Sequence, residues 1–307
     1  MIRVGTCSWA DESFVKVWYP RGMRSGEERL RYYAEHFDTV EANSTFYRLP
    51  DEAMVARWAE RLPEGFVMHV KAFGLMTRHP VKLEVLPPDL QGEAPIDSGG
   101  RVDRPSRELH AEVFRRFLSA LEPLRASGKL GGILMQFPPY VVPKPASYEY
   151  LEWAQEQLDG HEMLVEFRHK SWFEQPAETL SFLEQRGMTY VTVDAPPAVI
   201  PLVVAHTTPT VCVRFHGRNQ STWFKRTGSA AERFDYLYSG EELQVWARTL
   251  RELAGEAETV YAMFNNNGRS LSTDAPPNLL GEVDRREVAQ APTKAAMLGR
   301  LLETPGS

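Results

Sequence analysis

The chain has 307 residues, of which 43% are hydrophobic, 25% charged and 11% aromatic. This is an ordinary globular composition, and the length suits one large barrel or two smaller domains. The net charge of −6 gives no general electrostatic reason to bind nucleic acid or a membrane, so an anion would have to be held by a local positive patch.

The two cysteines, Cys7 and Cys212, each lie inside an apolar run, which predicts two reduced thiols in the core of a cytosolic protein. The N-terminal stretch Met1–Trp9 lacks the basic start and long apolar stretch of a signal peptide, and it already has the pattern of a strand. The chain has no run of about 18 apolar residues, which is the length needed to span a bilayer. We therefore expect a soluble, cytoplasmic protein with no membrane partner.

Short runs of β-branched and aromatic residues alternate with helical patterns along the chain. The runs have the length and apolar character of buried parallel strands. We predict eight strands: Arg3–Ser8, Thr39–Asn43, Phe66–Lys71, Gly132–Phe137, Met163–Arg168, Thr189–Asp194, Val211–His216 and Thr259–Asn265.

The segments between the strands have apolar residues at the spacing of amphipathic helices. The sixth connection, Pro196 to Thr210, is rich in proline and is expected to be short or irregular. Ser239 marks a helix start and Gly187 a helix stop. The predicted helices are Glu27–Phe37, Glu52–Leu62, Leu109–Leu124, Tyr148–Leu158, Ala177–Arg186, Glu241–Ala254 and Arg286–Leu302.

Eight consecutive strand–helix units predict an α/β fold of the TIM-like (β/α)8 barrel type. An open doubly wound sheet is the alternative, but no glycine-rich fingerprint follows the first strand. We expect a single domain over residues 1–307, with a long extended loop of about residues 73–105 inserted after strand 3. Loops of this length in a compact domain are usually lids or surface excursions.

Polar residues follow the predicted strands where they end, which is where active sites of such barrels lie. Because side chains alternate between the two faces of a strand, we can predict which of them face the mouth of the barrel, at the C-terminal ends of the strands. They include three carboxylates and four permanent cations. Their net charge of +1 favours an anionic ligand, because Arg side chains suit phosphate or carboxylate. These residues are Glu41, Asn43, Lys71, Gln136, Glu166, Arg168, Asp194, Arg214, His216, Arg218, Asn265, Asn266 and Asn267.

The same residues have a simpler interpretation, in which internal ion pairs such as Glu166–Arg168 or Asp194–Arg214 only neutralise each other. Aromatic residues flank the polar ones, and Trp9, Tyr47 and Trp172 are candidates to stack against a nucleobase or a sugar. The alternative is that such rings pack the loops.

Seven motifs, taken together, resemble the YecE-like family, also called domain of unknown function 72. They are spread in the family's order over about residues 1–280. Cys7 departs from the small, serine-like residue of the family pattern. The resemblance implies a TIM-like barrel but supplies no reaction. The motifs are Gly5–Trp9, Glu41–Pro50, Gln136–Pro139, Glu166–Trp172, Val193–Asp194, Arg214–Arg218 and Phe264–Asn267.

The leading functional hypothesis is a hydrolase, of phosphodiesterase type, acting on a phosphate-bearing substrate such as a nucleotide or single-stranded nucleic acid. Lysine and arginine would hold the phosphate, while Glu166, Asp194 and His216 would bind a divalent metal or act as general base. A mode without metal, using only the cations, is an equal alternative.

Two other functions fit the same residues. A glycosidase-like or sugar-processing enzyme would use Glu166 and Asp194 as its carboxylate pair, although neighbouring arginines would tend to lower the pKa of the required acid. A non-catalytic module that binds an anionic ligand would use the mouth for recognition only.

Overall fold

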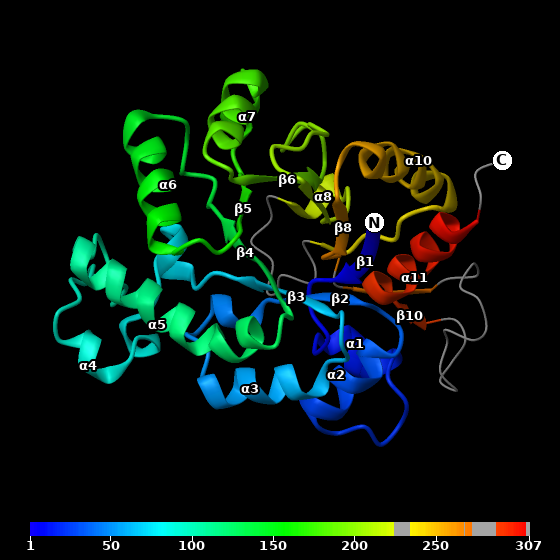
Figure 1. Cartoon of the computed structure of the whole chain (residues 1–307), viewed down its shortest axis with the longest axis horizontal. Coiled ribbons are helices and arrows are strands. Elements are labelled where there is room, and N and C mark those ends of the chain that lie inside the picture. The colour runs from blue at the N-terminus through cyan, green and yellow to red at the C-terminus, as the bar shows by residue number, and fades with distance from the viewer. Residues whose placement is uncertain (224–233, 267, 272–286, 305–307) are drawn as a thin grey trace. The chain divides into compact units, whose positions relative to one another are not determined.

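The computed structural model describes residues 1–223, 234–266, 268–271 and 287–304 (Figure 1). Its strands form one closed barrel in the chain order β1 to β8, which confirms the predicted TIM-like (β/α)8 fold. Each strand lies within about two residues of its predicted position. The strands are β1 (Ile2–Thr6), β2 (Thr39–Ala42), β3 (Val67–Lys71), β4 (Leu130–Gln136), β5 (Met163–Glu166), β6 (Thr189–Asp194), β7 (Thr210–Phe215) and β8 (Thr259–Phe264).

The helices follow the predicted amphipathic segments, and the segment between β6 and β7 is irregular, as expected from its prolines. Ser239 caps its helix and Gly187, in the left-handed region, follows the end of another. The helices are α1 (Glu12–Val17), α2 (Gly26–Ala34), α3 (Glu52–Arg61), α4 (Pro88–Gln91), α5 (Arg107–Ala126), α6 (Pro145–Gln157), α7 (Pro176–Gln185), α8 (Gln220–Trp223), α10 (Gly240–Glu256) and α11 (Gln290–Glu303).

The chain divides into two compact units. The first unit combines Met1–Glu41 with Thr189–Ser307, and the second is Ala42–Met188. The expectation of one domain over residues 1–307 therefore stays a prediction, and the two units are described separately.

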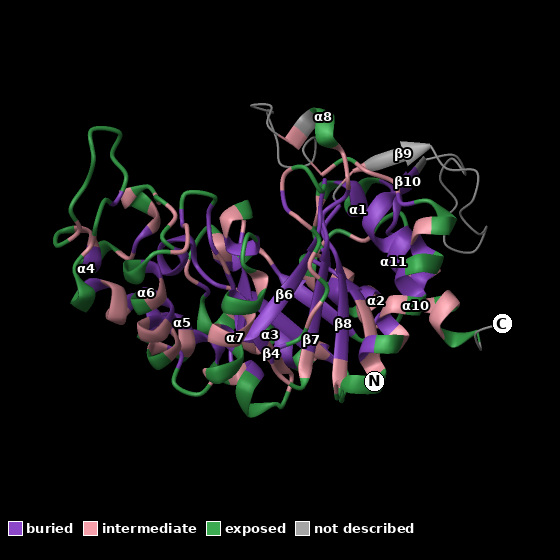
Figure 2. Cartoon of the chain, turned by 90° about the horizontal axis from the view of Figure 1, so that it is seen from above, coloured by how far each residue is buried: buried purple, intermediate pink, exposed green. Residues whose placement is uncertain are grey.

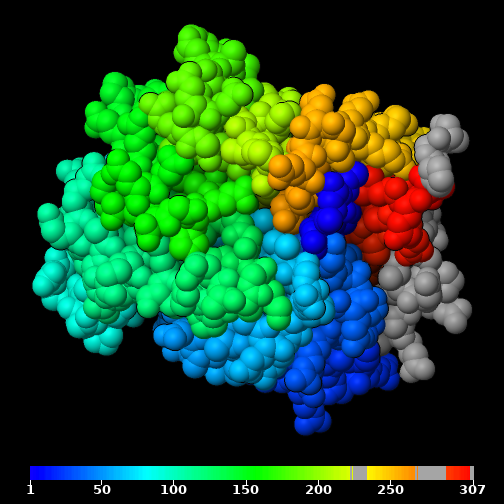
Figure 3. Space-filling view, viewed as in Figure 1, coloured from blue at the N-terminus to red at the C-terminus, as the bar shows by residue number. Residues whose placement is uncertain are grey.

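In the first unit, the first and the eighth strand of the barrel lie side by side. β1 pairs in parallel with β8, from Ile2 opposite Val260 to Thr6 opposite Phe264. The Met1 ammonium group also donates to the carbonyl of Glu258 at 2.7 Å. Figure 3 shows the first residues of the chain at the surface, beside the residues of β8 and α11. The barrel of this chain is thus closed by its first and last strands.

Helices α10 and α11 cover this closure, and α11 packs against both β1 and β8. The sequence predicts a helix that begins at Arg286, but this boundary is wrong. Residues Glu287–Ala289 form strand β10, which pairs antiparallel with β9 (Arg269–Leu271), and α11 begins at Gln290. Arg286 itself lies outside the described residues. A short pairing over three residues has no periodicity that distinguishes it from the first turn of a helix.

In the second unit, α3 packs against α5. The glycine pair Gly131–Gly132, which follows Leu130 at the start of β4, permits close packing inside the barrel wall. A side chain at Gly131 would collide with the ring of His69, and one at Gly132 with Leu164. His69 is buried, and its Nδ1 accepts the Gly132 backbone N–H at 2.9 Å. His69 is therefore part of the core of this unit.

The segment of about residues 73–105 follows β3, but it is not simply extended. It contains the short 3₁₀ helices η2 (Gly74–Thr77) and η3 (Leu83–Val85) as well as α4. Its two halves are joined by antiparallel bridges between Lys82 and Arg101 and between Ile96 and Val102. Local hydrogen bonding therefore gives this insertion internal structure, which its many prolines do not indicate.

Burial follows the barrel wall, with the strands buried along most of their length and the outer faces of the helices exposed (Figure 2). Cys7 and Cys212 are both buried and form no disulfide, as predicted. Among the described residues, no helix is long and apolar enough to cross a membrane.

Candidate functional site

In the first unit, the predicted site residues begin with a buried ion pair between β2 and β7. Arg214 donates to both carboxylate oxygens of Glu41, with Nε–Oε2 at 2.9 Å and Nη2–Oε1 at 2.6 Å. The two side chains are 0% and 1% exposed. Cys7 lies beside this pair, and burial followed by the Glu41 charge raises the pKa of its thiol well above the usual value. A ligand cannot reach this pair without displacing core residues.

His216 extends this buried arrangement. Its Nε2 lies 3.3 Å from Arg214 Nη1, and its Nδ1 lies 2.9 Å from the side-chain amide of Asn265. Arginine can only donate, so Nε2 accepts from Arg214, while the amide nitrogen Nδ2 of Asn265 faces the other ring nitrogen, Nδ1. Both ring nitrogens are thus engaged. His216 is also fully buried, so its predicted role as a base or ligand stays a prediction that this geometry does not favour.

Asp194, at the end of β6, is held by a second arginine. Arg218 donates to Oδ1 from Nε at 2.7 Å and to Oδ2 from Nη2 at 3.0 Å. The suggested Asp194–Arg214 pair is therefore wrong, because Arg214 is already occupied by Glu41. Burial raises the pKa of Asp194, while the hydrogen bonds and charge of Arg218 act in the opposite direction.

Helix α10 contributes two site residues that the sequence did not indicate. The indole Nε1 of Trp246 donates to Oδ2 of Asp194 at 2.7 Å. Glu242 accepts from Nη1 of Arg218 at 3.2 Å and from the hydroxyl of Tyr236 at 2.7 Å. In the sequence, Trp246 fits the apolar face of a helix and Glu242 fits a helix-capping position, so neither stands out as a site residue. With two carboxylates around Arg218, this cluster has no surplus positive charge.

The second unit brings four other predicted site residues together. Lys71 Nζ and Arg168 Nη2 both donate to the same oxygen of Gln136, at 3.2 and 3.0 Å. Arg168 also forms an ion pair with Glu166, as predicted, and these two side chains are 11% and 0% exposed. Two cations therefore converge on a neutral acceptor, with one carboxylate between them. We call Lys71, Gln136, Glu166 and Arg168 the cation cluster.

Aromatic rings adjoin the cation cluster. The ammonium group of Lys71 lies 4.3 Å from the ring centre of Phe46, and Phe46 meets the ring of Tyr47 edge-on with the centres 5.2 Å apart. Tyr47 is 67% exposed, so its face is available to a ligand. His79 contacts Phe46 from another side, with ring centres 4.9 Å apart. Tyr47 is thus the predicted stacking residue that this geometry favours.

The two predicted tryptophans lie in the interior instead. Trp172 is fully buried, is stacked on Phe167 with ring centres 3.9 Å apart, and donates its indole N–H to the Val141 carbonyl at 2.8 Å. Trp9 is 7% exposed, and its carbonyl accepts the hydroxyl of Tyr19. The surroundings of Trp172 are those of a core residue, because no part of its ring reaches the surface.

The asparagines have local roles. Asn43 is half-buried and precedes the 3₁₀ helix η1 (Ser44–Phe46). Asn266 is fully buried and donates to the carbonyl of Tyr236 at 2.8 Å, while Asn267 lies outside the described residues. Among the described residues, no group of three or more His, Cys, Asp and Glu side chains is placed to hold a metal ion.

Two histidines of the second unit give the protein a predictable response to acid. Burial, followed by the charges of Lys71 and Arg168, lowers the pKa of His79 to about 4. Burial, followed by the charge of Arg78, lowers the pKa of His110 to about 4. In the unfolded chain both have a pKa of about 6.5. Between these values the unfolded chain binds more protons, so the free energy of unfolding falls as the pH falls.

We expect the free energy of unfolding to decrease by on the order of 2 kcal/mol between pH 7 and pH 5, allowing for the partial exposure of both rings. Urea unfolding at the two pH values measures this. A His79→Gln/His110→Gln double variant, which cannot titrate in this range, serves as the control. If the double variant loses as much stability as the wild type, other groups cause the response.

Comparisons with known proteins agree with this architecture. A family model described as "Protein of unknown function DUF72" matches residues 3–297. The UPF0759 protein YunF of Bacillus subtilis is 32% identical over 301 residues, which cover 95% of this chain and 98% of YunF. The UPF0759 protein YecE of Escherichia coli K12 is 28% identical over 203 residues, which cover 64% of this chain and 60% of YecE.

Two solved structures have the same fold. A DUF72 family protein from Thermotoga maritima (TM1631) has a TM-score of 0.74 and 30% identity, over 99% of this chain and all of the other. A DUF72 family protein from Enterococcus faecalis (EF0366) has a TM-score of 0.75 and 23% identity, over 100% of this chain and 97% of the other. The descriptions of these proteins name no substrate.

Proposed function

The chain belongs to the DUF72 family of proteins of unknown function. From the geometry of its site residues, we propose that it is an enzyme acting on a phosphate-bearing substrate, bound at the cation cluster. The observation that carries the proposal is the shared acceptor. Lys71 and Arg168 both donate to Gln136, at 3.2 and 3.0 Å. Like charges held this close repel each other, so an incoming anion stabilises the arrangement.

The two cationic side chains of the cluster favour phosphate over a neutral ligand. Arg168 is paired with Glu166, and both Arg168 and Lys71 donate to the neutral oxygen of Gln136. A phosphate group brings further oxygen acceptors and negative charge, and hydrogen bonds between ionised partners are about twice as strong as neutral ones. The amide of Gln136 is then a positioning group that keeps the two donors together.

The aromatic rings beside the cluster favour a nucleotide or single-stranded nucleic acid as the substrate class. Tyr47 presents an exposed face, and Phe46 connects this ring to Lys71. Nucleobases stack on exposed aromatic faces without sequence preference, while neighbouring cations hold the phosphate backbone. In this proposal the ring of Tyr47 stacks on one base, and Lys71 and Arg168 hold its phosphate.

Glu166 is the carboxylate closest to the bound phosphate in this proposal. Hydrolysis requires a water oxygen to attack phosphorus, a base to take the water proton, and the ester oxygen to leave. Glu166 is buried and paired with Arg168, so the bound phosphate would first take over Arg168, and the released carboxylate would take that proton while Lys71 and Arg168 stabilise the charge on the phosphate oxygens. A divalent metal would supply further charge stabilisation, but no step here depends on one.

The sugar-processing alternative receives less support. It needs Asp194 as a second working carboxylate. Both oxygens of Asp194 are already occupied, by Arg218 and by the indole of Trp246. A nucleophile or an acid in that position would first have to lose these bonds, so we assign Asp194 to positioning Arg218.

We expect Lys71→Met and Arg168→Met each to weaken binding of adenosine monophosphate by about 10-fold or more, because each removes a hydrogen bond from a charged donor. Isothermal titration calorimetry on the full chain measures this. Lys82→Met, which removes an exposed lysine paired with Glu84, is the matched control and should bind like the wild type. Unchanged affinity in both cluster variants would contradict the proposal.

Activity separates an enzyme from a binding module. The wild type should release nitrophenolate from p-nitrophenyl phosphate or from its bis-ester, a reaction followed by absorbance. If binding of adenosine monophosphate depends on Lys71 and Arg168 but no phosphate ester is turned over, the protein is a non-catalytic anion-binding protein.

A further inference from the structure

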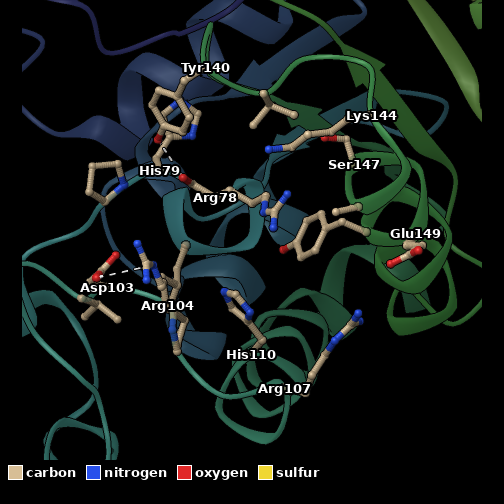
Figure 4. Close-up of a pocket in the computed structure, with 17 residues that line it drawn as sticks. Arg78, His79, Asp103, Arg104, Arg107, His110, Tyr140, Lys144, Ser147 and Glu149 are labelled. Carbon is tan, nitrogen blue, oxygen red and sulfur yellow. Dashed lines mark hydrogen bonds and ion pairs between the residues drawn. The ribbon is translucent and has the colours of Figure 1, made fainter.

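The second unit contains a cavity whose lining includes none of the four residues of the cation cluster. Its volume is about 610 Å³, within the range of small-molecule sites. Its walls come from the segment after β3, the start of α5, the loop after β4 and the start of α6. Figure 4 shows the cationic side chains arranged around it. They are Arg78, Arg104, Arg107 and Lys144.

This cavity has more positive than negative charge, although the whole chain is acidic. Its carboxylates are Asp103 and Glu149. Asp103 pairs with Arg104 at 3.9 Å, and both of these side chains are mostly exposed. In the described part of the chain, Arg78, Arg107 and Lys144 have no carboxylate partner within ion-pair distance. An acidic protein that gathers unpaired cations around one hollow has a local preference for anions.

One of these cations is held in place. The guanidinium carbon of Arg78 lies 4.7 Å from the ring centre of Tyr150, and the hydroxyl of Tyr150 is fixed by a 2.8 Å bond to the Met76 carbonyl. Arg78 also has a φ of 64°, in the left-handed region that a side chain rarely adopts. Its carbonyl accepts the hydroxyl of Tyr140 at 2.7 Å. Arg78 is thus preorganised beside the cavity.

The start of α6 supplies a second feature of an anion site. Pro145 occupies the first position, and no side chain caps the helix at Lys144. The positive end of the helix dipole therefore lies at the cavity. Ser147 lines the cavity and is 1% exposed, and its hydroxyl has no hydrogen-bond partner within the described residues. Buried hydroxyls are usually hydrogen-bonded, so the Ser147 hydroxyl is a polar group available to a ligand in this cavity.

His110 supplies another buried polar atom of this kind. It lines the same cavity from α5, and its Nε2 is buried without a partner in the described structure. Its low pKa keeps the ring neutral at pH 7, so Nε2 adds hydrogen-bonding capacity but no charge. Apolar residues Leu75, Val102 and Val141 complete the walls.

We propose that this cavity binds a small phosphate monoester with an apolar or aromatic body. The phosphate lies at the start of α6, where Lys144, Ser147 and Arg78 provide charged and neutral donors. The body of the ligand lies against the apolar wall, with His110 available to a polar group. This site goes beyond the proposed function and uses none of the residues of the cation cluster.

The test uses phenyl phosphate as the probe and phenol as its neutral match, in titration calorimetry on the full chain. We expect phenyl phosphate to bind and phenol to bind at least 10-fold more weakly. Arg78→Met and Lys144→Met should each weaken phenyl phosphate binding by about 10-fold, because each removes a charged donor. Ser147→Ala should weaken it by a smaller factor. Both cationic side chains are exposed, so these variants should fold.

Two controls distinguish this cavity from the cation cluster. Lys82→Met should bind phenyl phosphate like the wild type, since Lys82 lies outside the cavity lining. The proposed function predicts that the cation cluster binds phosphate esters as well, so the titrations are repeated in a Lys71→Met background, where Arg78→Met and Lys144→Met should still weaken the remaining binding by about 10-fold. Loss of all phenyl phosphate binding in Lys71→Met together with wild-type binding in Arg78→Met and Lys144→Met would overturn the cavity proposal and leave the proposed function intact. Absence of phenyl phosphate binding by the wild type would overturn it as well.

Discussion

Replacing Arg214 by methionine is expected to lower the free energy of unfolding by about 3–5 kcal/mol, as measured by urea unfolding at pH 7. The guanidinium and its partner Glu41 are 0% and 1% exposed and are joined by two hydrogen bonds. Without Arg214, the Glu41 carboxylate stays in the core with no opposite charge. Water cannot replace the lost donor in this interior, so the full cost of burying the charge appears in stability.

A double variant, Glu41→Leu/Arg214→Met, is the informative comparison. It removes both charges, and apolar replacements of a buried pair are often neutral in stability. We expect it to be more stable than Arg214→Met alone. Arg125→Met is the surface control, since its pair with Glu122 is half exposed and should contribute at most about 1 kcal/mol. A double variant that is less stable than either single variant would show that the pair has a different role.

Replacing Glu166 by glutamine is expected to reduce hydrolysis of a phosphate ester by about 100- to 10,000-fold, the range for loss of a general base. Glutamine keeps the shape of the side chain but cannot take a proton. Binding of adenosine monophosphate should persist, because Lys71 and Arg168 remain. The measurement is turnover of p-nitrophenyl phosphate, with urea unfolding of the same variant to confirm that it folds.

Asp194→Asn is the comparator for this prediction, because it changes the other predicted carboxylate in the same way. Its oxygens are held by Arg218 and Trp246, so a change there should alter stability more than turnover. If Asp194→Asn loses activity while Glu166→Gln stays within 10-fold of the wild type, the assignment of the base is wrong.

The barrel could be predicted from sequence because its signal repeats eight times. Each strand is a short apolar run that ends in polar residues, and an error of one or two residues at any strand does not change the count. The predicted start of the C-terminal helix is wrong for the opposite reason. The pairing of Glu287–Ala289 with Arg269–Leu271 depends on two segments that are distant in sequence, and neither has a pattern of its own.

The polar residues at strand ends were identifiable, but their partners were not. Strand alternation placed Asp194 and Arg214 near each other, yet the actual partner of Arg214 comes from β2, far away in the chain. Trp246 and Ser147 were missed because each fits a helix pattern. Whether an indole N–H meets a carboxylate, or a hydroxyl faces a cavity, depends on how the helix is rotated against its neighbours.

The pairing of β1 with β8 has a consequence for how the chain is made. At about 5–20 residues per second, β8 leaves the ribosome roughly 10–50 s after β1. Throughout that interval, the edge of β1 that will pair with Val260–Phe264 has backbone groups without their final partners. An open strand edge attracts other strands. The nascent chain therefore depends on the speed of synthesis, or on assistance in the cell, to keep β1 unpaired until its partner arrives.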